Sequence, residues 1–437
     1  MTGTAAVDGG VVDVVCLGES MVTFLPSRPG RLADVPSFAR AIGGAESNVA
    51  CALAGAGHSV RWVSRVGADG FGDHLIAAVA AYGVDTGAVR RDPGRPTGIY
   101  FRTATDRATD AHEVVYYRAG SAASAMSPAN VPTDDLDRAR ILHLSGITAA
   151  LSPDCLALMR GLTARRPGRP LLSFDVNHRP GLGLDDPAVL LELARGADLV
   201  FVGEDEAERA WGLDGPASIR DALPEPAVLV VKQGARGAVA YAREAQPAGP
   251  VRPAPGRSRD TETHVPAPRV DVVAPVGAGD AFAAGFLSAT LRGLPVGDRL
   301  RHGHLMAAAA LTVPGDLGSP PPAGPSGPDD PAGPGSTAHA PTAHAPAAHA
   351  PTAHAPTAHA PTAHAPAAHA PTAHAPTAHA PTAHAPTAHA PTARYAAPLT
   401  LAYADRLVAL DDDRWGTLHL GPGWTAAAQA TEEVRTP

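Results

Sequence analysis

The chain has 437 residues, among them 45 glycines and 45 prolines, and its formal net charge is −8 at pH 7. This acidic balance argues against nucleic acid as a partner. The three cysteines are scattered without metal-ligand spacing, and no apolar stretch reaches the roughly 18 residues that span a bilayer. Because the beginning of the chain also shows no signal-peptide pattern, we expect a soluble, cytoplasmic protein that is not bound to a membrane.

From residue 11 onward, apolar strand-like segments alternate with helix-like ones. Strands are expected at 11–17, 60–66, 171–174, 199–202 and 228–231, and helices at 45–56, 72–82, 152–165, 187–195 and 204–211. Short apolar strands alternating with helices are typical of a doubly wound α/β fold with a mainly parallel sheet. Active sites of such sheets lie at the carboxyl ends of the strands. We therefore expect functional residues at 175–177, 204–206 and 277–280.

Two segments, about 20–42 and 98–118, break this alternation because they are rich in β-forming residues. The second reads as a hairpin around a polar turn. A third segment, 243–268, is rich in proline and arginine and is predicted to be a long exposed loop. Residues 399–410 have the pattern of a helix, so 394–437 is expected to hold a C-terminal helix and a tail.

Residues 320–393 form a Pro/Gly-rich and then repetitive insertion. The pentapeptide (Thr/Ala)-Ala-His-Ala-Pro recurs from Thr337 to Pro391, with eleven histidines from His339 to His389. Proline at every fifth position forbids a continuous helix, and the composition offers no core, so we expect disorder. Clustered imidazoles would suit a metal; the alternative is a neutral repeat expansion in a surface loop.

The most informative segment is 271–290, where an apolar strand-like run leads into the turn Gly277-Ala278-Gly279 and a helix opens on Asp280. Glycines bare the backbone N–H groups, and the helix N-terminus adds partial positive charge, which together bind phosphate. A carboxylate beside such an anion hole suits phosphoryl transfer to an alcohol. Asp280 would take the hydroxyl proton, while the turn stabilises the phosphate in flight. A tight turn with Asp280 as a helix cap is the simpler alternative.

This segment resembles the C-terminal signature of the PfkB (ribokinase-like) sugar kinases. Their N-terminal signature is also present, in Gly43–Ala50 and Val66–Gly72. The resemblance implies a ribokinase-like core over residues 11–319, in which the segments 20–42 and 98–118 form a small β-sheet lid over the sugar. It further implies an ATP- and Mg²⁺-dependent carbohydrate kinase with a small-molecule substrate, and we expect a homo-oligomer.

The resemblance also suggests which residues hold the nucleotide and the metal. Lys232 follows a strand and begins a turn, where a cation and exposed N–H groups suit phosphates. A role through water on Mg²⁺ is implied for Glu206, although a helix N-terminal charge is an equal alternative. The predicted ATP-binding residues are Asn177, Lys232, Gln233, Gly234, Arg236, Gly237, Gly277, Ala278 and Gly279.

For the sugar, Gly44 lets the backbone approach a ligand and Asn48 can bond hydroxyls. The stretches 116–122, 143–148 and 175–180 look like markers of the 2-keto-3-deoxygluconate kinases within the family. That substrate carries a carboxylate, which two guanidinium groups would clamp. The predicted substrate site consists of Gly44, Asn48, Tyr100, Tyr116, Tyr117, Arg118, Arg179 and Asp280.

The sequence therefore predicts a kinase that phosphorylates the terminal primary hydroxyl of 2-keto-3-deoxygluconate. One alternative is a kinase of the same family for a neutral sugar of the fructose or ribose type. Another, from a different class, is a non-catalytic protein whose histidine repeat binds a metal or a partner.

Overall fold

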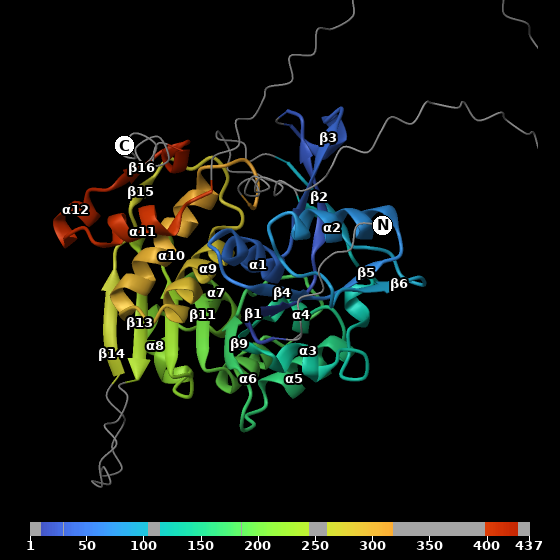
Figure 1. The fold of residues 1–437 in the computed structure, drawn as a ribbon, viewed down its shortest axis with the longest axis horizontal. Helices are drawn as coiled ribbons and strands as arrows, with labels where there is room; N and C mark the ends of the chain where they lie inside the picture. The colour runs from blue at the N-terminus through green and yellow to red at the C-terminus, as the bar shows by residue number, and fades with distance from the viewer. Residues whose placement is uncertain are drawn as a thin grey trace, which may run out of the picture. The chain divides into compact units, whose positions relative to one another are not determined.

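The computed structural model describes residues 10–28, 30–103, 114–184, 186–243, 260–317 and 398–426. All of them fall in one compact unit. Its centre is an eight-stranded sheet in the order β14-β13-β12-β11-β10-β9-β1-β4 (Figure 1). Six of these strands pair in parallel, and β13 and β14 add an antiparallel margin. The strands are β1 (Val12–Leu17), β4 (Val60–Val63), β9 (Ala139–Ser145), β10 (Leu171–Asp175), β11 (Leu199–Gly203), β12 (Val228–Lys232), β13 (Ala238–Arg243) and β14 (Asp260–Val265).

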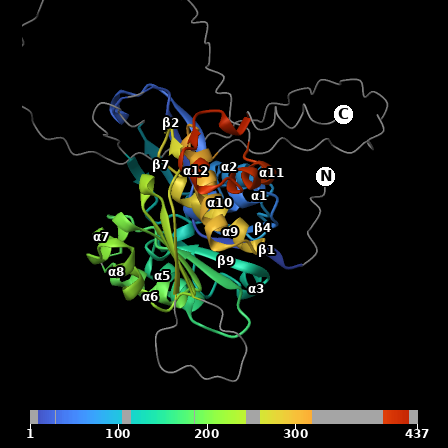
Figure 2. The same cartoon turned by 90° about the vertical axis from the view of Figure 1, so that its left-hand side faces the viewer.

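Helices cover both faces of this sheet (Figures 1 and 2). Successive side chains of a strand point to opposite faces, so Val14 of β1 enters one hydrophobic cluster and Val15 the other. The first cluster takes α1 (Ala45–Gly55), α2 (Gly70–Ala80), α9 (Ala278–Leu291), α10 (Val296–Leu311), α11 (Leu401–Val408) and α12 (Asp412–Gly416). The second takes α3 (Thr133–Asp137), α4 (Gly146–Ala149), α5 (Pro153–Thr163), α6 (Ala188–Gly196), α7 (Glu204–Trp211) and α8 (Gly215–Ala222). The predicted doubly wound, mainly parallel fold is confirmed.

A smaller four-stranded sheet has the order β3-β2-β7-β8. It consists of β2 (Met21–Pro26), β3 (Phe38–Gly43), β7 (Ile99–Arg102) and β8 (Val114–Tyr117). The rings of Phe24 and Phe101 stack across it at 4.6 Å, and Phe38 meets Phe101 edge-on. The small sheet expected from 20–42 and 98–118 is therefore present. Two further strand pairs are β5 (Arg65–Gly67) with β6 (Arg90–Asp92), and β15 (Arg269–Val270) with β16 (His419–Leu420).

Three expectations about single segments were wrong. The run 60–66 is broken at Ser64 into β4 and β5. The segment 243–268 is not all loop, because β14 lies against β13, where its residues Glu262 and His264 are exposed at the margin of the sheet. The apolar run 271–275 is no strand: the N–H groups of Val273 and Ala274 both donate to the Leu311 carbonyl at the end of α10, and the side chains of Val272 and Val273 are 50% and 43% exposed.

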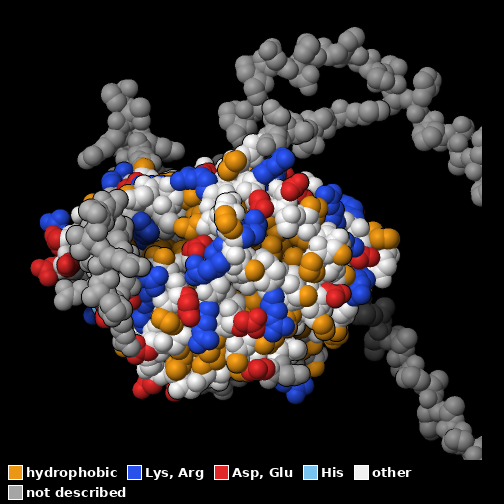
Figure 3. Space-filling view, turned by 90° about the horizontal axis from the view of Figure 1, so that it is seen from below, with side chains coloured by type: hydrophobic (Ala, Val, Ile, Leu, Met, Phe, Trp, Pro, Cys, Tyr) orange, Lys and Arg blue, Asp and Glu red, His pale blue; other side chains and the backbone are white. Residues whose placement is uncertain are grey.

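The surface mixes charge and apolar groups. Figure 3 shows one face on which basic, acidic and hydrophobic side chains are interspersed. None of the helices that the structure describes is long and apolar enough to cross a membrane. The histidine repeat lies outside the described residues, so its predicted disorder stays a prediction, as does the homo-oligomer.

Residues on both sides of the repeat contribute to one core. Helix α11 packs on α10, where Arg301 donates to the Val408 carbonyl at 2.8 Å, and Asp405 of α11 pairs with Arg292 at the end of α9 at 2.7 Å. Trp415 is 1% exposed. Residues 398–426 thus belong with the α/β core, although they follow the repeat in the chain.

We expect that deleting residues 322–393 leaves the melting temperature and the kcat nearly unchanged. The removed stretch of Ala, Pro, His and Thr has little apolar area to bury. Differential scanning calorimetry and a kinase assay on both chains test this. The matched control is deletion of 398–426, which removes Trp415 and should abolish soluble expression. A large decrease in the melting temperature or in kcat on deleting the repeat would show that the repeat packs on the core.

Candidate active site

Helix α9 begins at a turn whose shape requires glycine. Gly277 has φ +77°, and a Cβ there would lie 2.4 Å from the carbonyl oxygen of Asp316. The first N–H groups of an α-helix have no partner within the helix. Those of Ala278 and Gly279 therefore offer donors and partial positive charge at the point where Asp280 ends the first turn.

Asp280 lies partly buried between α1 and the end of β10. The Asn48 amide donates to Asp280 Oδ2 at 2.9 Å, and the Asn177 amide approaches Oδ1 at 3.4 Å. Burial raises the pKa of Asp280 to about 7, helped by the charge of Asp175 and opposed by the hydrogen bond from Asn48 and by the charges of Arg179 and Lys232. A carboxylate with a pKa near neutrality is well suited to general-base catalysis.

The carboxyl ends of β10 and β12 place two opposite charges beside α9. Lys232 Nζ donates to both oxygens of Asp175, at 2.8 and 3.1 Å. The same nitrogen is 3.5 Å from the place that a Cβ on Gly279 would occupy, so the ammonium lies next to the turn. Burial alone lowers the pKa of Lys232, but the charges of Asp175, Glu206 and Asp280 raise it overall. The Lys232 side chain is therefore a cation beside the turn.

The turn after Lys232 is built on two glycines in the left-handed region. Gly234 has φ +59° and Gly237 φ +123°, and a Cβ on Gly237 would lie 2.2 Å from the Val265 carbonyl oxygen. Gln233 donates to Glu204 at 3.1 Å, and the exposed Arg236 pairs with the same carboxylate. The predicted nucleotide residues thus lie together at one end of the sheet, but Gln233 and Arg236 are directed at Glu204.

Glu206, the predicted metal residue, has a protein partner on each oxygen. The Gly203 amide donates to Oε2 at 3.0 Å, and Arg179 donates to Oε1 at 3.2 Å. The part of the chain that the structure describes holds no group of three or more His, Cys, Asp or Glu side chains placed for a metal. Mg²⁺ commonly takes one or two carboxylates together with substrate phosphates. The carboxylate oxygens of Glu206, near Lys232 and the anion turn, fit that donor chemistry.

Asp316, which the sequence did not reveal, contacts residues that were predicted to bind the substrate. Asp316 is 7% exposed and accepts from the Tyr100 hydroxyl at 3.3 Å. Arg102 pairs with its other oxygen at 3.2 Å, and Asn48 also hydrogen-bonds it. Asp316 follows α10 in a stretch without a motif, so only the fold reveals that it contacts the turn at Gly277.

The tyrosines divide between the two faces of the small sheet. Tyr100 and Tyr116 are directly paired across β7 and β8, and their ring centroids are 5.4 Å apart. Tyr117 lies on the opposite face, edge-on to Phe101. Gly44, also predicted for the substrate, is needed for packing, because a Cβ there would lie 2.3 Å from the Glu19 carbonyl oxygen.

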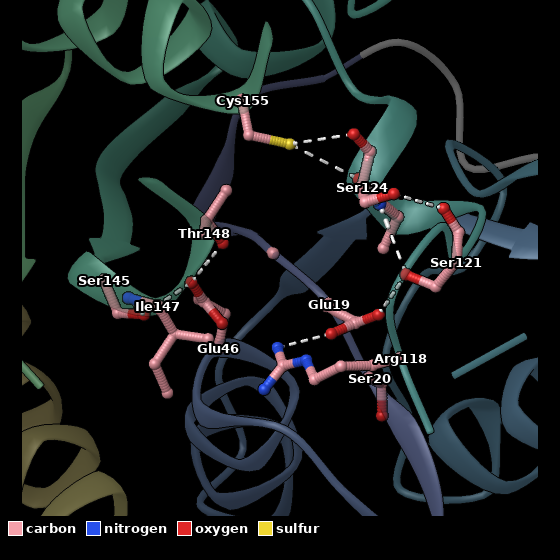
Figure 4. Close-up of polar contacts among 12 residues, drawn as sticks. Glu19, Ser20, Glu46, Arg118, Ser121, Ser124, Ser145, Ile147, Thr148 and Cys155 are labelled. Atoms are coloured by element: carbon pink, nitrogen blue, oxygen red, sulfur yellow. Dashed lines mark hydrogen bonds and ion pairs between the residues drawn. The ribbon is translucent and has the colours of Figure 1, made fainter. Parts of the chain in front are cut away.

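Arg118 follows β8 and is already paired within the protein. Its side chain is 9% exposed and forms an ion pair with Glu19, whose other carboxylate oxygen accepts from the Ser121 hydroxyl at 2.6 Å. The guanidinium also lies 5.7 Å from the centre of the Tyr116 ring. Figure 4 shows Glu19 and Glu46 on either side of this guanidinium.

Glu46 is a second fully buried carboxyl in this neighbourhood. It accepts from the hydroxyls of Ser145 and Thr148 at 2.7 and 2.8 Å, and burial raises its pKa. Gly18 makes room for it, since a Cβ there would lie 2.1 Å from the carboxyl carbon. Helix α1 is thereby fixed to the ends of β1 and β9, which sets the position of Asn48 two residues further along the helix.

An anion turn, a carboxyl with a pKa near 7 and a partly buried cation therefore lie together, and these are groups that phosphoryl transfer to an alcohol can use. Residues 12–323 match the family model described as "pfkB family carbohydrate kinase". The chain therefore belongs to the PfkB family of carbohydrate kinases, and its substrate is a small-molecule sugar.

Named relatives act on two kinds of sugar. A 2-dehydro-3-deoxygluconokinase of Bacillus subtilis is 34% identical over 319 residues, covering 70% of this chain and 91% of that protein. A probable chloroplastic fructokinase of Arabidopsis thaliana is 31% identical over 313 residues, covering 69% and 77%. The crystal structure of a PfkB protein from Polaromonas sp. JS666 superposes with a TM-score of 0.59 at 34% identity, covering 68% of this chain and 95% of that one.

We expect Asp280→Asn to lower kcat by about 10²–10⁴-fold, because the amide keeps the size of the side chain but accepts no proton. The wild-type kcat should rise with pH and level off above about 7, where Asp280 is ionised. The folded state binds this proton more tightly than the unfolded chain, so ionisation costs stability as pH rises. The variant should thus melt at the same or a higher temperature at pH 8. A kcat of the Asp280→Asn variant above a tenth of the wild-type value would exclude Asp280 as the base.

Proposed function

We propose that this kinase transfers the γ-phosphate of ATP to the terminal primary hydroxyl of 2-keto-3-deoxygluconate. The observation that carries the transfer is the geometry around Asp280, a carboxyl with a pKa of about 7 at the N-terminus of α9. The Lys232 ammonium lies beside the same turn. The similarity to the Bacillus subtilis 2-dehydro-3-deoxygluconokinase supports this choice of substrate.

In this mechanism, the sugar oxygen forms a bond to the γ-phosphorus while the bond from that phosphorus to the bridging oxygen breaks. The electron pair leaves with ADP, and the hydroxyl proton goes to the Asp280 carboxylate. The N–H groups of Ala278 and Gly279 stabilise the charge on the transferring group. Mg²⁺, when bound to the phosphates, neutralises part of their charge, and Glu206 would hold it directly or through water.

Two arginines support an acidic substrate. Arg179 follows β10 and is near enough to Asp280 to lower its pKa. Arg118 comes from the other side, after β8 of the small sheet, beside the Tyr116 ring. Guanidinium groups bind carboxylates with two parallel hydrogen bonds, which suits the carboxylate of a sugar acid.

A neutral sugar of the fructose type is the second candidate, and one observation favours it. Each arginine already has a carboxylate partner in the protein, Glu19 for Arg118 and Glu206 for Arg179. Neither guanidinium needs a substrate carboxylate to balance its charge. The similarity to the Arabidopsis thaliana fructokinase points in the same direction.

Substitution of the arginines separates the two candidates. We expect Arg118→Met and Arg179→Met each to lower kcat/KM for the keto-acid by about tenfold to a hundredfold, since a hydrogen bond to a charged group contributes about 1.5–3 kcal/mol. The loss should appear mainly in KM, because the carboxylate is remote from the reacting hydroxyl. Steady-state kinetics on the keto-acid and on fructose measure both effects.

Arg209→Met is the matched control, because Arg209 is an exposed arginine that pairs with Asp205 on α7. Its kcat/KM should equal that of the wild type on both sugars. If wild type prefers fructose, or if both site variants use the keto-acid as well as wild type does, the neutral-sugar candidate is the correct one.

A further inference from the structure

The ion pair between Asp175 and Lys232 has a feature that the base and the glycine turn do not explain. The two residues lie on strands β10 and β12, which are separated by β11 in the sheet. Lys232 must therefore extend its side chain across the end of β11 to reach Asp175 with the distances of 2.8 and 3.1 Å. Asp175 is 2% exposed, so its carboxylate is buried to meet this one ammonium.

The position of the Lys232 ammonium beside the Gly279 turn is as informative as its ion pair with Asp175. Lys232 Nζ lies 3.5 Å from the position of a Cβ on Gly279, within the turn that offers N–H groups to an anion. A lysine ammonium is a point charge on a flexible four-carbon stem, so its position varies unless another group holds it. A buried ammonium without a counter-charge also tends to lose its proton. Asp175 prevents both.

We propose that Asp175 is a positioning residue that holds the Lys232 ammonium at the Gly279 turn, where it meets the γ-phosphate of the nucleotide. This inference rests on the proposed kinase activity but not on the identity of the sugar. Lys232 is the catalytic cation, since it touches the transferring group, and Asp175 acts only through it. A fixed cation stabilises the developing charge without reorganising during the reaction.

The chain allows a direct test, because Lys232 is its only lysine. Acetic anhydride at pH 8 can therefore label one side-chain amine and the N-terminus, and peptide mass spectrometry measures the rate at Lys232. We expect β,γ-methylene-ATP with Mg²⁺ to protect Lys232 at least tenfold better than ADP does. In Asp175→Asn, the released amine should be acetylated at least tenfold faster than in the wild type.

A double-mutant cycle separates positioning from a general structural effect. Lys232→Met should lower kcat by about 10²–10³-fold, as loss of one oxyanion donor does. Asp175→Asn should lower it substantially in the wild type but change it little in the Lys232→Met background. The KM for the sugar should stay unchanged in each variant. Glu204→Gln is the control, because this carboxylate pairs with Gln233 and Arg236 and not with Lys232, so the labelling rate should not change.

Three results would overturn the proposal: equal protection by ADP and the analogue, an unchanged labelling rate in Asp175→Asn, or additive effects in the cycle. If Asp175→Asn does not fold, Asp175→Glu replaces it, and the protection experiment on the wild type still decides whether the ammonium meets the γ-phosphate. The labelling needs no sugar. Protection of Lys232 in an enzyme that ignores every sugar acid would refute the proposed substrate and leave this inference standing.

Discussion

The site depends on one hydrogen bond between two helices that are 232 residues apart in the chain, from the Asn48 amide to the Asp280 carboxylate. For this bond to form, the first turns of α1 and α9 must meet above the end of the sheet. Small residues make this possible, since α9 is lined with buried Ala283 and Ala284 and α1 with Ala50. The packing of the two helices therefore determines both the orientation of the base and the position of the anion turn.

The same meeting point concentrates charge in a poorly solvated place. Asp175, Glu206 and Asp280 surround one ammonium, and Asp280 responds with a raised pKa while Lys232 stays protonated. Charges buried together in this way contribute little net stability, because removing them from water costs about as much as their attraction returns. They match the proposed function, since a carboxyl that titrates near neutrality and a fixed cation are groups that phosphoryl transfer can use.

A second set of ion pairs lies at the small sheet. Arg118, which follows β8, is held by Glu19, and Arg102 at the end of β7 is held by Asp316, so the charges of both guanidinium groups are already balanced. Asp316 connects this sheet to the turn at Gly277, and Asn48 connects Asp316 to the base. The small sheet is thus linked to Asp280 through three contiguous contacts. A substitution in the small sheet would therefore alter the hydrogen bonding of Asp280 without contacting it directly.

The sequence by itself determined the fold class and predicted the main elements of the site. Short, fully apolar strand-like runs that alternate with helical segments predicted a buried parallel sheet, and the Gly277–Gly279 turn predicted an anion site, because both are local properties of the chain. The partners of these residues were not local. Nothing near Lys232 predicts Asp175, nothing near Tyr100 predicts Asp316, and Arg118 shows no sign of Glu19. Only the tertiary structure decided these pairs, since burial forces each charge to find a counter-charge from whichever element the fold brings beside it.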